Sequence, residues 1–261
     1  MNDFPKGSVW LVGAGPGDPE LLTRKAQRLI LTADIIFYDA LVGPEVLALA
    51  PQNLRLMPVG KRSGRHSKDQ KTIDQMIVDA ALAGQRVVRL KGGDPTIFGR
   101  ATEELEACRK AGITVQICPG VTAASGAAAS LGASLTLRGM ARKLTLITAH
   151  AKRGEALDLD WDALADAQAT LAVYMGKAAA GAVSRQLMAV GRRSDTPVAL
   201  VENATLPNER QFFTTLGLLP LASKTALGDG PALLLIGEAM RQRTASNSDV
   251  LGANNTQSTG R

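Results

Sequence analysis

Two turns with the same Gly-Asp-Pro order are the stretches of this sequence best suited to hold a ligand. They occupy residues 17–19 and 93–95, and each follows a short apolar segment. Glycine leaves backbone amide and carbonyl groups accessible and accepts torsion angles that other residues resist. Asp94 is a good helix N-cap and Pro95 fits a first helical turn, so we expect a helix to begin there. A turn of this kind at the carboxyl end of a parallel strand is where open α/β sheets bind ligands.

Two charged residues follow the second turn closely enough to act with it. Arg100 and Glu103 are three positions apart, a spacing that places both side chains on one helical face. Arginine has a pKa above about 12 and is a poor base, but its planar guanidinium binds a carboxylate through two hydrogen bonds. We therefore expect Arg100 to bind an acidic group of a substrate and so to fix the orientation of that substrate for reaction. The alternative is a surface ion pair, worth about 0–1 kcal/mol.

The first turn is similar to the Gly-x-Gly-x-x-Gly fingerprint of dinucleotide-binding folds but departs from it. Gly13 and Gly15 fit the pattern, whereas Asp18 occupies the sixth position and Pro16 stiffens the loop. In that fingerprint the third glycine allows close packing of helix on strand. A nicotinamide-dependent oxidoreductase is therefore disfavoured.

A basic run in the loop 60–68 suggests an anionic partner. It contains Lys61, Arg62, Arg65 and Lys68, and the chain has a formal net charge of +6. A charge run is usually solvated surface, but an excess of positive charge also attracts acidic ligands. Aromatic residues make up only 3% of the chain, which leaves few platforms for stacking single-stranded nucleic acid. A small, highly anionic substrate is the preferred partner, and no nucleic acid is expected.

Composition and cysteine usage are typical of a cytoplasmic globular protein. The 261 residues are 45% hydrophobic and 21% charged. No apolar run approaches the length of a membrane span, and the N-terminus lacks the features of a signal peptide. Cys108 and Cys118 form no C-x-x-C pair and no zinc pattern. We expect two reduced, buried thiols, no metal site and no membrane association.

The alternation of short apolar strands with helical segments predicts an α/β fold. In the first half, which reads as one doubly wound domain, strands are expected at 9–12, 35–38, 55–58, 87–90 and 114–118. In the second half they are expected at 144–149, 170–175, 197–202, 211–215 and 232–236, the strands at 197–202 and 211–215 being close enough for an antiparallel hairpin. Helices are expected around 22–33, 73–81, 119–132, 161–165 and 183–190.

The predicted domain organisation has two α/β domains and a tail. Residues 135–139 look extended and exposed, so we expect an N-terminal domain over 1–136 and a C-terminal domain over 137–240. Residues 241–261 are polar and lack periodicity, which favours a disordered tail.

Taken in order, the motifs resemble those of the tetrapyrrole methyltransferases. The stretches that carry the resemblance are V-G-A-G-P-G-D-P-E-L-L-T, Y-D-A-L-V, G-K-R-x-G-x-H-S, V-V-R-L-K-G-G-D-P-x-I-F-G-R, C-P-G-V-T-A-A and Y-M-G. They cover about residues 8–240 with natural spacing, which is far more specific than any single glycine loop. Within that family the motifs are most similar to those of the uroporphyrinogen-III C-methyltransferases.

The resemblance implies a fold, a reaction and partners. The fold would be two α/β domains of the class III S-adenosylmethionine (SAM)-dependent methyltransferase type, with the cofactor in the cleft between them and a homodimer as the assembly. The reaction would methylate uroporphyrinogen III at ring carbons 2 and 7, giving precorrin-2 by way of precorrin-1, with S-adenosylhomocysteine as the second product. The product would enter sirohaem, cobalamin or haem d1 synthesis.

The family's site residues carry over position by position. Those that would contact the cofactor are Pro16, Gly92, Gly93, Asp94, Ile97, Thr122, Ala123, Met175, Ala204 and Ala232. Those that would contact the substrate are Arg100, Glu103, Arg138, His150 and Met175, with Arg100 also the catalytic candidate. The substrate has eight carboxylates, which suits the arginines and the basic loop.

Two departures from the family pattern concern single residues. The family usually has T-H-R where this chain has Thr136-Leu137-Arg138, so the arginine is kept and a histidine is missing. It usually has G-T where this chain has Ala204-Thr205, a change of one small residue for another. His150 follows a strand, where a histidine more often has a structural role than a catalytic one; the resemblance favours substrate binding.

Three other functions agree less well with the sequence. A later precorrin methyltransferase of cobalamin synthesis would share the fold, but the match through G-R-A-T-E-E and L-T-L-R argues against it. The nicotinamide oxidoreductase is weakened at Asp18, and a basic nucleic-acid-binding protein is weakened by the low aromatic content and by the two ligand-like turns.

Overall fold

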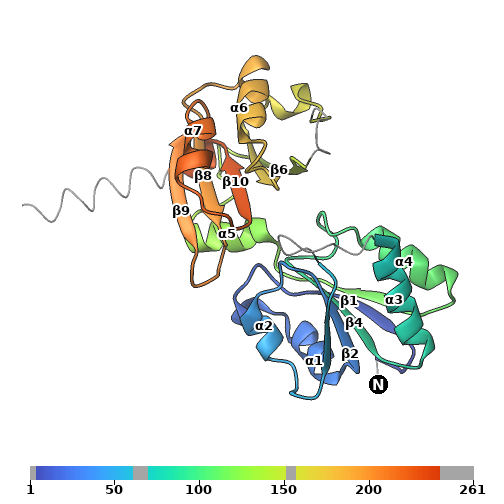
Figure 1. Cartoon of the computed structure of the whole chain (residues 1–261). Helices are drawn as coiled ribbons and strands as arrows, with labels where there is room; N and C mark the ends of the chain where they lie inside the picture. Colours follow the sequence, from blue (N-terminus) through green and yellow to red (C-terminus); the bar gives the residue numbers. More distant parts are fainter. Residues whose placement is uncertain (1–3, 61–69, 151–156, 242–261) are drawn as a thin grey trace, which may run out of the picture. The chain divides into compact units, whose positions relative to one another are not determined.

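The computed structural model describes residues 4–60, 70–150 and 157–241 (Figure 1). The basic run 61–68 and the tail from residue 242 onward lie outside the described residues. The chain divides into two compact units, residues 1–126 and 127–261, and the division falls inside helix α5 (Ala123–Leu131). The domain boundary after residue 136 stays a prediction.

The first unit is built on a sheet of parallel strands. The strands are β1 (Val9–Gly13), β2 (Ile35–Tyr38), β3 (Arg55–Pro58), β4 (Val87–Lys91) and β5 (Val115–Cys118). Their order is β3-β2-β4-β1-β5, and every pairing is parallel. β1 and β4 are buried along their whole length, as the continuous apolar runs of a central parallel strand require. Because all the strands are parallel, their carboxyl ends lie at one edge of the sheet.

Helices cover both faces of this sheet, which confirms the doubly wound arrangement (Figure 1). Alternate residues of β1 point to opposite faces. Trp10 and Val12 pack in the cluster that contains the apolar residues of α1 (Arg24–Thr32) and α2 (Pro44–Ala48). Val9 and Leu11 pack in the other cluster, with α3 (Gln70–Leu82) and α4 (Ala101–Lys110).

The second unit is built on a mixed sheet. The strands are β6 (Lys143–Thr148), β7 (Ala169–Tyr174), β8 (Pro197–Glu202), β9 (Arg210–Thr215) and β10 (Ala232–Ile236), in the order β6-β7-β10-β8-β9. β6 and β7 are parallel, whereas β10 is antiparallel to both β7 and β8. β8 and β9 form the antiparallel pair that the sequence predicts. The ends of β6, β7 and β8 and the start of β10 therefore share one edge.

Helices α6 (Ala180–Ala189) and α7 (Leu219–Thr225) contribute to the core of the second unit. Val183 and Leu187 of α6 and Leu219 of α7 are fully buried in one cluster with residues of β7, β8 and β10. Short 3-10 turns, η2 (Asp162–Leu164) and η3 (Glu238–Met240), complete this unit, as η1 (Pro19–Leu21) does in the first. The helix expected at 161–165 is thus only a single 3-10 turn.

The strands predicted from the sequence are all present among the described residues, with bounds that differ by one residue at most. The helix predicted to begin at Asp94 is wrong, because α4 begins at Ala101 and residues 94–100 form turns. Two causes are visible. The Asp94 carboxylate accepts a hydrogen bond from the Gly120 amide of another loop, and Phe98 and Arg100 have φ angles of 53° and 55°, outside the right-handed helical region.

Both cysteines are free and buried, as expected. Burial raises the pKa of the Cys108 thiol to about 11, with smaller contributions from Glu104 and Asp74. Cys108 is therefore not suited to be a reactive thiolate. Among the described residues, the helices are too short or too polar to cross a membrane.

Asp34 and Arg86 form an ion pair that ties the start of β2 to the start of β4. The carboxylate accepts bonds from the Arg86 backbone amide at 2.7 Å and from its guanidinium at 2.8 and 3.1 Å. The hydrogen bond from the Arg86 side chain is the largest cause that lowers the pKa of Asp34, against a smaller opposing effect of burial. A carboxyl whose folded-state pKa is lowered stabilises the protein above its unfolded pKa, and this stabilisation is lost as the pH falls through the folded value.

We expect Asp34→Asn to lower the free energy of unfolding by about 1 kcal/mol at neutral pH, since both side chains are about 30% exposed. The difference from the wild type should shrink as the pH falls from about 5 to about 3. Urea unfolding at several pH values measures both. The control is Asp79→Asn, on the exposed face of α3, which should change little at any pH. A deficit for Asp34→Asn that does not vary with pH would contradict this account.

Candidate functional site

At the carboxyl edge of the first sheet, hydrogen bonds join the loops after β1, β4 and β5. The first two are bonded backbone to backbone, and the third is bonded to the Asp94 carboxylate. The Gly93 amide donates to the Gly15 carbonyl at 2.7 Å, and the Gly15 amide donates to the Gly93 carbonyl at 3.2 Å. The Gly120 amide donates to Oδ2 of Asp94 at 3.0 Å. These bonds gather into one site the predicted cofactor residues of this unit, namely Pro16, Gly92, Gly93, Asp94, Ile97, Thr122 and Ala123.

Glycines are required at several positions of these loops because neighbouring loops approach too closely for a Cβ atom. A Cβ atom at Gly13 would lie 2.6 Å from the Gly120 Cα and 2.7 Å from the Gly93 carbonyl oxygen, and one at Gly120 would overlap the same oxygen. A Cβ at Gly92 would lie 2.7 Å from the Leu41 Cβ. These glycines are therefore accounted for by the packing of the protein itself.

Gly93 differs from these three glycines. It has φ of 67°, and a Cβ there would meet nothing closer than the Ala123 amide nitrogen at 3.8 Å. The positive φ favours glycine, while a Cβ would fit in ordinary van der Waals contact with the Ala123 amide nitrogen. Glycine is therefore explained here by the backbone conformation and not by close packing.

The two Gly-Asp-Pro turns contain the same local hydrogen bond, as the repeat in the sequence suggests. Oδ1 of Asp18 accepts from the Glu20 amide at 2.8 Å, and Oδ1 of Asp94 accepts from the Thr96 amide at 2.7 Å. The second turn also holds another loop, because the Gly120 amide donates to Asp94. Both oxygens of Asp94 are thus engaged within the protein, so its first role is to fix the turn.

Arg100 is the N-cap residue of α4 and lies six residues beyond Asp94. Its Nε donates to Oε1 of Glu103 at 2.8 Å, and the two side chains are 60% and 42% exposed. Burial tends to raise the pKa of Glu103, but the hydrogen bond from Arg100 and further favourable interactions lower it overall. The pair predicted from the sequence is present, and the guanidinium remains accessible to a ligand.

A buried charge cluster behind the second turn was missed by the sequence analysis. Arg89 and Lys91 are buried on β4 and contact the fully buried Glu104 of α4, at 2.8 and 2.7 Å. Arg89 also lies 3.9 Å from Asp39 at the end of β2. Burial, and next the charge of Arg89, lower the pKa of Lys91. The sequence signal that could have revealed this cluster is V-V-R-L-K at residues 87–91, where two cationic residues lie two positions apart in an otherwise apolar strand.

Unusual backbone angles cluster near the predicted site residues. Among the described residues, those other than glycine with positive φ are Phe98, Arg100, Met175, Asn203 and Thr205. Each is a predicted site residue or lies within two residues of one. Such conformations cost about 1–3 kcal/mol each and persist where the surrounding structure imposes them, which is often at functional sites.

The second unit gathers four predicted site residues at one edge of its sheet. His150 follows β6, Met175 follows β7, Ala204 follows β8 and Ala232 begins β10. The strand register pairs Thr148 with Tyr174 and Ala232 with Glu202, so all four lie at the same edge. Arg138 is not among them, because it lies in the turn before β6, at the other end of that strand.

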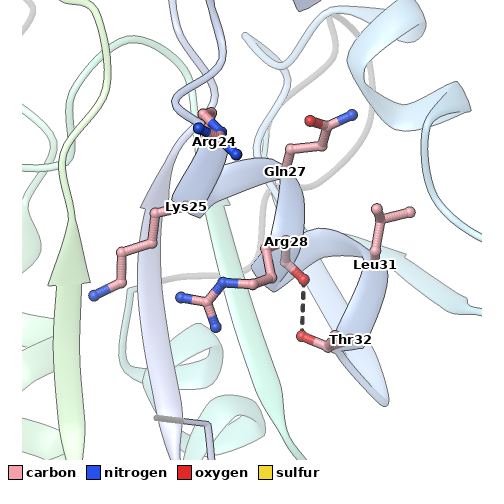
Figure 2. Close-up of a pocket in the computed structure, with 6 residues that line it drawn as sticks. All are labelled: Arg24, Lys25, Gln27, Arg28, Leu31 and Thr32. Carbon is pink, nitrogen blue, oxygen red and sulfur yellow. Dashed lines mark hydrogen bonds between the residues drawn. The ribbon is translucent and has the colours of Figure 1, made fainter. Parts of the chain in front are cut away.

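A further pocket lies along the outer face of α1 (Figure 2). The residues that line it are Arg24, Lys25, Gln27, Arg28, Leu31 and Thr32. The Lys25 ammonium lies 4.0 Å from the centre of the Trp10 ring, and the Thr32 hydroxyl donates to the Arg28 carbonyl at 2.8 Å. None of these residues was predicted to belong to a site.

Comparisons with known proteins give consistent results. A family model described as Tetrapyrrole (Corrin/Porphyrin) Methylases matches residues 8–220. The uroporphyrinogen-III C-methyltransferase of Paracoccus denitrificans is 47% identical over 231 residues, which are 88% of this chain and 80% of that protein. Siroheme synthase 3 of Aeromonas hydrophila is 49% identical over 90% of this chain and 49% of that protein. The chain thus spans about half the length of the siroheme synthases it matches.

Two solved structures share the fold over most of the chain. A cobalamin biosynthetic enzyme, cobalt precorrin-4 methyltransferase, has a TM-score of 0.80 and 28% identity, covering 90% of this chain and 96% of that one. Uroporphyrin-III C-methyl transferase from Thermus thermophilus, complexed with S-adenyl homocysteine, has a TM-score of 0.76 and 38% identity, covering 90% and 99%.

We expect Gly120→Ala to disturb the joined loops, because its Cβ would overlap the Gly93 carbonyl oxygen. Overpacking of this kind costs about 1–3 kcal/mol, which thermal and urea unfolding can measure. The matched control is Gly181→Ala in α6, where the nearest atom to the new Cβ is Nη1 of Arg185 at 3.5 Å. That change should leave stability equal or slightly higher. Equal stability of the two variants would show that the loops are not closely packed.

Proposed function

The chain belongs to the family of tetrapyrrole (corrin/porphyrin) methylases, and from this membership we propose that it is a SAM-dependent uroporphyrinogen-III C-methyltransferase. It methylates uroporphyrinogen III at ring carbons 2 and 7 and gives precorrin-2 by way of precorrin-1. The observation that carries the proposal is the 47% identity to a protein of that name over 80% of its length. The match to siroheme synthases favours a role in sirohaem synthesis.

The residues at the edge of the first sheet fit SAM. The cofactor has a cationic sulfonium, an amino-acid group and an adenine, and backbone carbonyl and amide groups can bind all three. Gly93 has no side chain and lies close to the Ala123 amide, so its main chain is proposed to be accessible to the cofactor. Pro16, Ile97 and Thr122 belong to the same joined loops. Met175, Ala204 and Ala232 are proposed to complete the site from the second unit.

When bound, SAM supplies a methyl group on a sulfonium, which a pyrrole carbon accepts as the ring nitrogen becomes positive and later loses a proton. Arg100 is proposed to bind an acetate or propionate of the macrocycle and so to fix the attacking carbon. The left-handed φ of Arg100 and its bond to Glu103 hold the guanidinium outside the helix, in an accessible position. Arginine is a poor base, so orientation is the role that its chemistry favours.

Other parts of the proposal concern residues and partners away from the joined loops. His150 and Arg138 are proposed to contact the substrate, and the basic run 61–68 is proposed to attract its carboxylates. The protein is proposed to act as a cytoplasmic homodimer, with the cofactor between its two domains. The alternative substrate is a later precorrin, because the cobalt precorrin-4 methyltransferase shares the fold with a TM-score of 0.80.

Anaerobic incubation of the purified protein with SAM and uroporphyrinogen III tests the proposed reaction. We expect S-adenosylhomocysteine and a tetrapyrrole with two added methyl groups, whose mass is greater by two CH2 units because each methylation also releases a proton. Mass spectrometry and the absorption of the oxidised product measure this. A parallel incubation with a later precorrin should give no methylation. Methylation of the later precorrin alone would replace the proposed substrate, and no binding of SAM in calorimetry would overturn the proposed function.

Arg100→Lys tests the orienting role. Lysine keeps the charge but cannot reproduce the two-pronged contact with a carboxylate, so we expect turnover to fall by about 100-fold while SAM affinity is kept. The matched control is Arg193→Lys, because Arg193 is also an exposed arginine that pairs with a nearby carboxylate, Asp195, at 2.7 Å. That variant should retain wild-type turnover. Normal turnover of both Arg100→Lys and Arg100→Ala would show that the Arg100–Glu103 contact is only a surface ion pair.

A further inference from the structure

Glu202, the last residue of β8, has a carboxylate that is almost fully buried and bound on several sides. Its side chain is 2% exposed. Oε2 accepts from the Gly228 amide at 2.8 Å and Oε1 accepts from the Gly230 amide at 2.9 Å. The ammonium of Lys177 lies 3.5 Å away and the guanidinium of Arg210 lies 3.9 Å away.

These contacts join three separate segments at one edge of the second sheet. Lys177 is two residues beyond Met175, the residue after β7. Gly228 and Gly230 belong to the loop that leads into Ala232 and β10. Ala204 is two residues beyond Glu202 itself. These three segments therefore each carry one of the cofactor residues proposed for this unit, whereas Arg210, at the start of β9, belongs to a segment that carries none.

The backbone around Glu202 is constrained as well. The Asn203 amide donates to the Pro231 carbonyl at 2.9 Å, so the loop after β8 is bound directly to the loop before β10. On its far side the Thr205 amide donates to the Glu209 carboxylate at 2.5 Å. Asn203 and Thr205 both have positive φ, at 54° and 66°. Ala204 thus lies between two residues in costly conformations that these bonds impose.

A buried carboxylate requires this degree of pairing, since an unpaired buried charge is strongly destabilising. Stability alone would be served equally well by an apolar side chain of similar size. A charge that binds two amides of one loop and two cations of other segments does something an apolar residue cannot, because its bonds fix direction and distance for each segment.

We propose that Glu202 is a positioning residue for the cofactor, which holds the segments of Met175, Ala204 and Ala232 in one binding arrangement. This inference rests on the proposed function and adds to it a residue that does not itself touch the ligand. The carboxylate sets the affinity for SAM and for S-adenosylhomocysteine, and leaves the transfer step to other residues.

Glu202→Gln is the direct test. The amide replaces one acceptor oxygen with an NH2 group, so one of the two glycine amides loses its partner, and the neutral side chain no longer attracts Lys177 and Arg210. We expect calorimetry to show S-adenosylhomocysteine binding at least about 10-fold weaker than in the wild type. The KM for SAM should rise similarly, while kcat at saturating SAM stays within about 2-fold. Glu202→Asp keeps the charge, and its shorter side chain should give an intermediate loss of S-adenosylhomocysteine affinity. This variant provides the test if Glu202→Gln does not fold.

The matched control is Arg192→Lys. Arg192 is another buried charge of the same unit, and its guanidinium donates to the carbonyls of Leu164, Asp166 and Ala169 at the opposite edge of the sheet. This variant should lower the melting temperature without weakening S-adenosylhomocysteine binding. The inference is overturned if Glu202→Gln binds within 2-fold of the wild type, or if Arg192→Lys loses as much affinity. Absence of binding by the wild type would instead overturn the proposed function.

Discussion

The first unit depends on a close approach of main chain to main chain where β1, β4 and β5 end. The amides and carbonyls of Gly15 and Gly93 pair with each other, and the Gly120 amide donates to Asp94. At Gly13 and Gly120 the neighbouring backbone leaves no room for a Cβ. The packing of the sheet places the three strand ends side by side, and the glycines let the loops touch. The proposed ligand-binding surface of this unit is therefore made largely of backbone, in agreement with the many glycine, alanine and proline residues of the motifs.

Each unit also has a buried glutamate near the residues proposed to bind the cofactor. Glu104 binds Arg89 and Lys91 in the first unit, and Glu202 binds two glycine amides and two cations in the second. Glu104 supports the strand that leads into the Gly92–Asp94 turn, while Glu202 supports loops directly. Glu104 thus acts through side chains of a regular strand, whereas Glu202 binds the main chain of a loop directly.

The strands could be predicted from the sequence because short runs of β-branched and apolar residues bounded by turn residues are typical of buried strands. The loops after β1 and β4 could be located for the same reason. The start of α4 could not, because the carboxylate of Asp94 has two possible partners and the competing one, Gly120, is distant in sequence. Arg89, Lys91 and Glu104 were not recognised as a cluster, since a charged residue read in isolation is assigned to the surface. Glu202 was recognised only as the end of a strand, because its glycine partners are identified by tertiary structure alone.

The position of β10 affects how the chain can be made. In the first unit every strand lies between residues 9 and 118, so that sheet is complete before the second half of the polypeptide is synthesised. In the second sheet β7 and β8 are separated by β10, the last strand in the sequence. Until residues 232–236 leave the ribosome, β7 and β8 each present an unpaired edge, the kind of surface that promotes aggregation. Vectorial synthesis thus lets the strands of the first sheet pair early, whereas the second sheet keeps two unpaired strand edges until its central strand is inserted.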